Sequence, residues 1–253
     1  MLRSCIAAFS LYSKIPMPKI QWEDRTMRYS MCFFPLVGLV LGALEIFSFW
    51  LFTEVLPLGT ILTAAVLTVL PVLLTGGIHI DGYLDTVDAL SSWKSPEERR
   101  RILKDPHVGA FAVIYAGVLF LLAFGGWTEI RWTTIGVAAT GFVLSRALSG
   151  LSVVTFPKAG EEGTVKTIAS QSPASVKFIL AAEALVCAAV MIILQPGCGI
   201  ASVITALLIF TYYYVMSKKR FGGISGDLAG YFLCLCELGI LLAAVITGSV
   251  FLV

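Results

Sequence analysis

Three aspartates, Asp81, Asp85 and Asp88, carry the clearest chemistry in the sequence, within the segment TGGIHIDGYLDTVD at 75–88. At positions i, i+4 and i+7 of a helix, their side chains fall within about 60° of one another. Carboxylates at this spacing repel, and apolar neighbours increase the cost. A divalent cation offsets the repulsion, and oxygen ligands favour Mg²⁺ or Mn²⁺ over zinc. We therefore predict that the aspartates bind a metal; the alternative is a solvated acidic helix face.

His79 stands two residues before the first aspartate, so its direction depends on where the helix begins. If the helix includes His79, the ring faces away from the carboxylates. Gly76 and Gly77 are typical of a turn and favour a later start. Three roles stay open for this histidine: a general base, a group behind the metal ligands, or a structural residue.

A second polar segment, SPEERRRILKDPHVG, follows the aspartates. Ser95 and Glu98 have the spacing of a capping box, and Pro96 suits the first helical position. Pro106 should end the helix, because the residue before a proline avoids the α region. The sequence therefore predicts a short basic helix just after the acidic motif.

The cations of this short helix suggest a phosphate ligand beside the metal. Arg99, Arg100 and Arg101 are also explained by contact with lipid headgroups at the membrane surface. That explanation is weaker for Lys104, which lies at the turn after the helix, so we assign Lys104 to phosphate. Asp105 beside it is a further candidate metal ligand.

The glycine-rich turn FGGISGD opens the last apolar segment. Gly222 and Gly223 let backbone N–H groups approach an anion, and a helix N-terminus favours one. Asp227 at the end of the turn suits either a metal or an N-cap role. The turn follows three consecutive cations, so we predict that it belongs to the same site as the aspartates.

These motifs sit in a very apolar chain of 253 residues, 58% hydrophobic and 13% charged, with a mean hydropathy of +0.90. Soluble domains contain about 25% charged residues, and a spanning helix needs about 20 apolar ones. We predict an all-α polytopic membrane protein, a single domain over 1–253 with an interfacial N-terminal segment at 1–29. The six cysteines are expected to be small buried hydrophobes. Seven stretches are long enough to span: 30–52, 55–75, 108–127, 132–154, 176–195, 198–216 and 228–252.

The positions of the cations predict the orientation. All of the 18 Lys and Arg residues except Arg131 and Arg146 flank one side of the predicted spans, which should be cytoplasmic. The protein is then a multi-pass protein of the cell (cytoplasmic) membrane, with its active site on the cytoplasmic face and 76–107 as the catalytic loop. Arg146 lies in the cytoplasmic half of its helix, where it can reach that site.

Taken together, the motifs resemble the cobalamin synthase family, the adenosylcobinamide-GDP ribazoletransferases. The family pattern T-G-G-x-H-x-D-G-x-x-D-T-x-D matches 75–88, and K-D-x-x-x-G matches 104–109. A late G-G-x-T-G-D matches 222–227, with Ser225 for threonine. Weaker agreements are FFPLVG at 33–38, Ser145-Arg146 and Glu161-Glu162-Gly163. Departures from the family pattern are Ala89, His107 and Thr164-Val165.

The resemblance implies that a hydroxyl of α-ribazole, or of its 5′-phosphate, attacks the cobinamide-side phosphate of adenosylcobinamide-GDP, and that GMP leaves. Mg²⁺ on the aspartates would hold the diphosphate, and Lys104 would neutralise charge on the leaving group. An aspartate or His79 would take the hydroxyl proton. The implied partners are the two substrates and membrane lipid, with a homo-oligomer possible and no nucleic acid. The implied substrate contacts are Arg146, Glu162, Gly222, Gly223 and Ser225.

Two other classes of membrane protein also place aspartates in such segments. A CDP-alcohol phosphotransferase usually has D-x-x-D-G-x-x-A-R, but Ala89 follows Asp88 here and no Ala-Arg comes after it. A cation transporter usually has its polar groups near the middle of the bilayer, whereas these gather at one interface. Both alternatives are therefore less favoured than the transferase.

Overall fold

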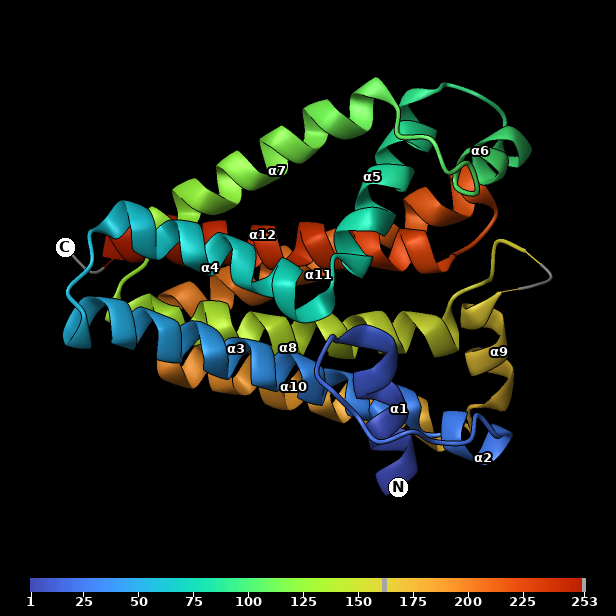
Figure 1. The fold of residues 1–253 in the computed structure, drawn as a ribbon, viewed down its shortest axis with the longest axis horizontal. Coiled ribbons are helices and arrows are strands. Elements are labelled where there is room, and N and C mark those ends of the chain that lie inside the picture. The colour runs from blue at the N-terminus through green and yellow to red at the C-terminus, as the bar shows by residue number, and fades with distance from the viewer. Residues whose placement is uncertain (161–162, 252–253) are drawn as a thin grey trace.

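The computed structural model describes residues 1–160 and 163–251, and these residues are mainly helical, with no β-strand among them (Figure 1). The all-α prediction is therefore confirmed for this part of the chain. The helices are α1 (Leu2–Tyr12), α2 (Asp24–Met27), η1 (Ser30–Phe33), α3 (Phe34–Trp50), η2 (Leu51–Val55), α4 (Thr60–Thr75), α5 (Ile78–Ser91), α6 (Pro96–Ile102), α7 (Ala110–Thr128), α8 (Trp132–Thr155), α9 (Thr164–Gln171), α10 (Ser175–Leu194), α11 (Pro196–Phe221) and α12 (Gly226–Phe251).

Six of these helices are long and apolar enough to span a membrane, and a seventh span is present if one bent helix pair is counted as a span. The six are the segment that contains α3, together with α7, α8, α10, α11 and α12. The pair is α4 and α5, which pass the same test together but are bent by 94°. Figure 1 shows α4 lying along the bundle and α5 running across it. The predicted number of seven spans is therefore reached when this pair is counted as one. The chain is a multi-pass membrane protein.

Helix α8 is the centre of the bundle. Of its most apolar stretch, 78% is buried, against 22% for α7 and α10. It packs against α3, α10 and α12. Gly42 of α3 allows one of these contacts, because a Cβ there would lie 2.5 Å from the carbonyl oxygen of Ala139. The outer helices keep exposed apolar faces, which suit contact with lipid.

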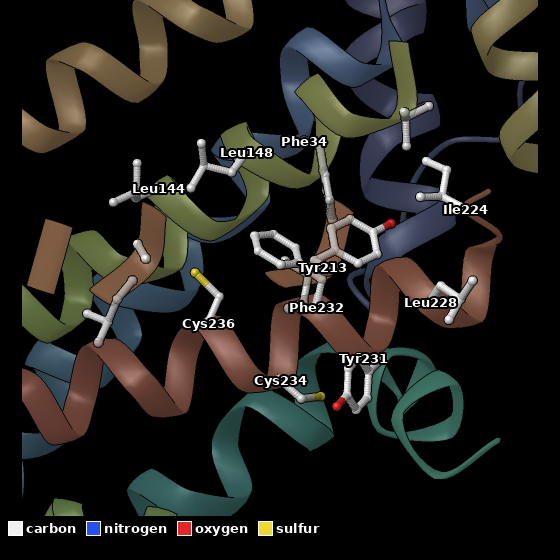
Figure 2. Close-up of a cluster of buried hydrophobic side chains, with 14 of the residues drawn as sticks. Phe34, Leu144, Leu148, Tyr213, Ile224, Leu228, Tyr231, Phe232, Cys234 and Cys236 are labelled. Carbon is white, nitrogen blue, oxygen red and sulfur yellow. The ribbon is translucent and has the colours of Figure 1, made fainter. Parts of the chain in front are cut away.

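The core between α8, α11 and α12 is packed with aromatic rings and thiols (Figure 2). Phe232 stacks on Tyr213 with ring centroids 4.9 Å apart. Cys234 and Cys236 point to different sides of α12, as residues two apart on a helix must. All six cysteines are free and five of them are buried, whereas Cys5 is half-buried. Their predicted role as small buried hydrophobes is confirmed for those five.

The polar connections gather at one end of the bundle. Figure 1 shows α6, α9 and the turn between α11 and α12 at the end near α1 and α2. The short turns after α3, α7 and α10 lie at the other end, where α12 also finishes. The two-sided arrangement predicted from the cations is therefore present in the bundle.

Two local features position the helices that carry the motifs. Gly76 and Gly77 have φ angles of 66° and 79°, which glycine adopts without steric cost, and they produce the bend before α5. The predicted capping box of α6 is confirmed, since Ser95 and Glu98 each accept a hydrogen bond from the other's backbone. This helix ends at Ile102, earlier than Pro106 alone predicts, because the chain turns tightly at once.

Candidate active site

Helices α5 and α12 cross at two glycines, and the crossing brings their acidic residues together. A Cβ on Gly82 would lie 2.7 Å from the backbone oxygen of Asp227. A Cβ on Gly230 would lie 2.9 Å from the carbonyl oxygen of His79. Neither position has room for a side chain. The sequence alone did not identify these glycines as helix contacts, although Gly82 lies within the acidic motif.

The crossing places Asp81 and Asp85 of α5 close to Asp227 of α12. The pKa of Asp85 is raised to about 6, first by burial and then by the negative charges of Asp81, Asp227 and Asp88. Among the described residues, neither Asp81 nor Asp85 has a hydrogen-bond or ion-pair partner. We call Asp81, Asp85 and Asp227 the carboxylate cluster. Its uncompensated charge favours a cationic ligand.

Asp88, the third aspartate of the motif, is engaged elsewhere. Its two carboxylate oxygens accept hydrogen bonds from the backbone N–H groups of Gly109 and Ala112, at 2.6 and 2.9 Å. Asp88 therefore caps the N-terminus of α7, where a negative charge is favourable. A Cβ on Gly109 would lie 2.6 Å from this carboxylate, so the glycine makes the cap possible.

A basic cavity of about 480 Å³ lies between α6 and the first turn of α12. Arg101 and Lys104 from the α6 region line it, together with Ser225 and Asp227. Arg100 also lines it, whereas we expected this side chain at the membrane surface. Cations that surround one face of a cavity suit a phosphate group.

An enclosed and mainly apolar cavity of about 240 Å³ lies on the other side of the carboxylate cluster. Tyr12 and Phe34 provide aromatic walls, and His79, Asp81 and Asp227 line it as well. Asp227 is shared with the basic cavity. A ligand in each cavity would therefore meet the other at the carboxylates.

A third, open cavity of about 650 Å³ lies beneath α1. Lys14, Gly77 and Asp81 are among the residues that line it. Because Asp81 also lines the enclosed cavity, the carboxylate cluster is the common boundary of all three spaces.

His79 is buried in the first turn of α5 and packs near two aromatic rings. Its ring centroid lies 6.4 Å from that of Tyr12 and 6.0 Å from that of Phe34. Burial, and then the charge of Arg146, lower the pKa of His79 to about 3. Its Nε2 atom has no hydrogen-bond partner among the described residues. The low pKa favours the neutral imidazole, which lines the enclosed cavity with its Nε2 atom buried.

The glycine-rich turn before α12 is tied to two other parts of the chain. Gly222 has a φ of 80°, and Gly223 packs directly on the backbone after α8. Ile224 donates a backbone hydrogen bond to Pro157 at 2.8 Å. Arg100 donates from its guanidinium to the last carbonyl of α11 at 2.8 Å. These contacts fix the start of α12 and hence the position of its aspartate.

Two predicted site residues, Arg146 and Asp105, are not brought to the carboxylate cluster. Arg146 is fully buried in the bundle and donates to Glu237 at 2.5 Å, without lining any of the three cavities. Asp105 is half-exposed and pairs with His107 at 2.7 Å. Glu162 lies outside the described residues. Substrate or metal contact by these three residues stays a prediction.

Comparison with known proteins identifies the family. The family model described as cobalamin-5-phosphate synthase matches residues 4–245. This chain belongs to that family. The adenosylcobinamide-GDP ribazoletransferase of Lachnoclostridium phytofermentans is 46% identical over 98% of this chain and 95% of its own. Proteins of the same name from Clostridium perfringens and Desulfitobacterium hafniense are 34% and 32% identical, over 94% and 96% of this chain and 95% and 96% of their own. No solved structure matches.

Membership of the cobalamin-5-phosphate synthase family confirms the resemblance inferred from the motifs. The chain is a transferase of cobalamin biosynthesis. The structure explains why glycine stands at two positions of the family motifs. Gly82 allows the crossing of α5 and α12, and Gly109 allows the cap on α7.

The carboxylates of the cluster match one way in which proteins bind a metal. No three His, Cys, Asp or Glu side chains of the described residues are close enough to hold an ion alone. Magnesium usually takes only one or two carboxylates, and water and substrate phosphates complete its shell. Asp81, Asp85 and Asp227 beside a basic cavity fit that mode. Asp88 does not join them, because both its oxygens bind the backbone of α7.

Proposed function

We propose that this protein joins adenosylcobinamide-GDP to α-ribazole, or to α-ribazole 5′-phosphate, in a Mg²⁺-dependent reaction at the cytoplasmic end of the bundle. The products are adenosylcobalamin, or its 5′-phosphate, and GMP. The observation that carries the proposal is the meeting of a basic and an aromatic cavity at one carboxylate cluster. The names of the relatives support the same chemistry.

The reaction replaces the phosphoanhydride bond of the donor with a phosphate ester bond to the acceptor. The ribazole hydroxyl oxygen forms a bond to the phosphorus on the cobinamide side of the diphosphate. The bond from this phosphorus to the bridging oxygen breaks, and GMP leaves with the electron pair. Such a displacement depends mainly on positioning and on neutralisation of charge. Asp81 is exposed, has no partner and lines the enclosed cavity, so we assign it as the acceptor of the hydroxyl proton.

The basic cavity is assigned to the nucleotide half of the donor. Lys104 and Arg101 face the diphosphate there, and Lys104 neutralises the charge that develops on the departing GMP. Asp85 and Asp227 would hold Mg²⁺, which would supply further neutralisation of the diphosphate when bound. The open cavity beneath α1 leaves room for the bulky corrinoid half.

The enclosed cavity is assigned to the acceptor nucleoside. A planar, largely apolar base suits the aromatic wall that Tyr12 and Phe34 form together, with their ring centroids 4.3 Å apart, better than a guanine, whose edges need many hydrogen bonds. The buried imidazole of His79 lies in the wall of the same cavity. With the base bound there, the ribose hydroxyl points to Asp81 and Asp227 at the boundary with the donor.

The direct test is to incubate the purified protein, in lipid nanodiscs, with adenosylcobinamide-GDP, α-ribazole and Mg²⁺. We expect GMP and a corrinoid phosphodiester to appear in equal amounts. A parallel reaction with a CDP-activated lipid alcohol should release no CMP. Release of CMP, or no release of GMP, would contradict the proposal.

The cytoplasmic position is tested by labelling sealed cells with a membrane-impermeant thiol reagent. Ser95→Cys, in the loop before α6, should stay unlabelled. Glu129→Cys, in the exposed turn between α7 and α8, should react and serves as the matched control. Labelling of the unaltered protein, through its native cysteines, is measured in parallel and subtracted as background. Labelling of Ser95→Cys from outside would reverse the assigned orientation.

A further inference from the structure

A second basic cavity lies away from the carboxylate cluster, between α6 and the C-terminal part of α11. Its volume is about 380 Å³. Three cations surround it: Arg99 of α6, and Lys219 and Arg220 of α11. Its lining, as far as the chain is described, contains no aspartate or glutamate. We call this space the α6–α11 cavity.

Arg99 distinguishes this cavity from an ordinary positively charged flank of a membrane protein. Cations that only contact headgroups project from the surface, but Arg99 is 5% exposed. Its guanidinium makes no hydrogen bond or ion pair with any described residue, and its Nε is fully enclosed. Burial, and then the charge of Arg220, lower the pKa of Arg99. A buried cation beside a second cation is costly unless an anion joins them.

The shape of the cavity indicates the kind of anion. The α11 residues that line it, from Tyr212 through Val215 to Lys219 and Arg220, recur at three- and four-residue steps and so form one helix face. Over about 12 Å along this face the lining changes from aromatic and aliphatic to cationic. Trp93 stands beside it with 87% of its surface exposed, as interfacial tryptophans do in membrane proteins.

We infer that the α6–α11 cavity binds an anionic phospholipid. Its phosphate lies between Arg99, Lys219 and Arg220, because guanidinium groups match phosphate oxygens in two-point hydrogen bonds. Its acyl chains follow Tyr212 and Val215 along α11. A soluble phosphate or nucleotide has the same anionic group but no part that uses the apolar wall. The site is separate from the residues assigned to the transferase reaction.

Lipid binding is measured by native mass spectrometry of the full chain in detergent, titrated with phosphatidylglycerol or phosphatidylcholine. We expect phosphatidylglycerol to bind at least tenfold more tightly. Lys219→Gln and Arg220→Gln should each weaken it about fivefold, and the double variant about 25-fold. Both side chains are exposed, so these variants keep the core intact. Lys218→Gln is the matched control: it removes a charge from the same turn, but Lys218 does not line the cavity, and binding should not change.

Three results would overturn the inference. Equal binding of the two lipids would remove the anionic preference. Unchanged phosphatidylglycerol binding in the double variant would place the lipid elsewhere. Displacement of the lipid by inorganic phosphate or GMP at millimolar concentration would identify a soluble phosphate as the ligand.

Discussion

The two ends of α5 use the same residue type for different purposes. At the N-terminal end, Asp81 and Asp85 have no partner among the described residues and lie beside Asp227. At the C-terminal end, Asp88 gives both oxygens to the backbone of α7. A carboxylate whose hydrogen bonds are satisfied within the fold stabilises it, whereas unsatisfied carboxylates cost stability and remain available for a ligand. The acidic motif therefore has a binding part, Asp81 and Asp85, and a structural part, Asp88.

The Arg146–Glu237 pair in the bundle interior follows the structural pattern. Arg146 and Glu237 are paired at 2.5 Å, and Ser145 donates a hydrogen bond to the same carboxylate. Removing one member of such a pair is costly because a buried charge is left behind. The pair explains why α8 and α12 tolerate charged residues at this depth, without assigning them to the reaction.

The largest expected effect is on the binding part of α5. Asp85→Asn keeps the shape of the side chain but removes one negative charge from the carboxylate cluster, where we propose that the metal binds. We expect turnover to fall about 1,000-fold or more, with the elution volume and helical content of the protein unchanged. GMP release measures this loss. Asp85→Asn with near-normal turnover would remove the carboxylate cluster from the mechanism.

The next largest effect is expected in the basic cavity. Lys104→Ala should lower kcat about 100- to 1,000-fold, because a contact with charge developing in the transition state is lost. Lys94→Ala removes an exposed cation before the same helix, outside the cavity lining, and should leave kcat unchanged. Similar small effects of the two variants would reject the assignment of Lys104.

The crossing of α5 and α12 at Gly82 and Gly230 should be disrupted by the addition of a single methyl group. Gly82→Ala forces α5 away from Asp227 and should destabilise the protein by about 1–3 kcal/mol, with loss of turnover. Gly117→Ala, on an open face of α7, should be neutral or slightly stabilising. Thermal unfolding in detergent compares them. Equal melting temperatures for both variants would mean that the crossing is not tightly packed.

The smallest effect is expected at the structural end of α5. Asp88→Ala should destabilise the protein by about 0.5–2 kcal/mol through loss of the cap on α7. Asp88→Asn keeps an acceptor oxygen and should retain most of both stability and turnover. If Asp88→Asn instead abolishes turnover while the fold persists, Asp88 belongs to the binding part, and the division of the motif is wrong.

Much of the fold could be predicted because it depends on local chemistry. The apolar stretches and the capping box of α6 are determined within windows of about 20 residues or fewer. Family membership could also be predicted, since one motif of fourteen residues is specific. The short helix α9 was missed because its eight residues are neither apolar nor flanked by a strong cap.

The site could be predicted only in part, because helix periodicity gives the direction of a side chain but not the neighbour that it meets. The spacing of the acidic motif placed Asp88 with the other two aspartates, but α7 begins beside it and takes both oxygens. Arg146 points into the bundle because its partner Glu237 lies on α12. The crossing at Gly82 and Gly230 joins distant parts of the chain, and no local pattern reveals it.

The most direct test of the central claim is the Mg²⁺ dependence of GMP release, measured side by side for the unaltered protein and Asp85→Asn. The unaltered protein should be inactive in excess chelator and recover fully when Mg²⁺ or Mn²⁺ is restored, since both ions prefer carboxylate oxygen. Asp85→Asn should stay inactive at metal concentrations that saturate the unaltered protein. Full turnover in excess chelator would contradict the account, because the unpaired carboxylates would then have no cation to bind.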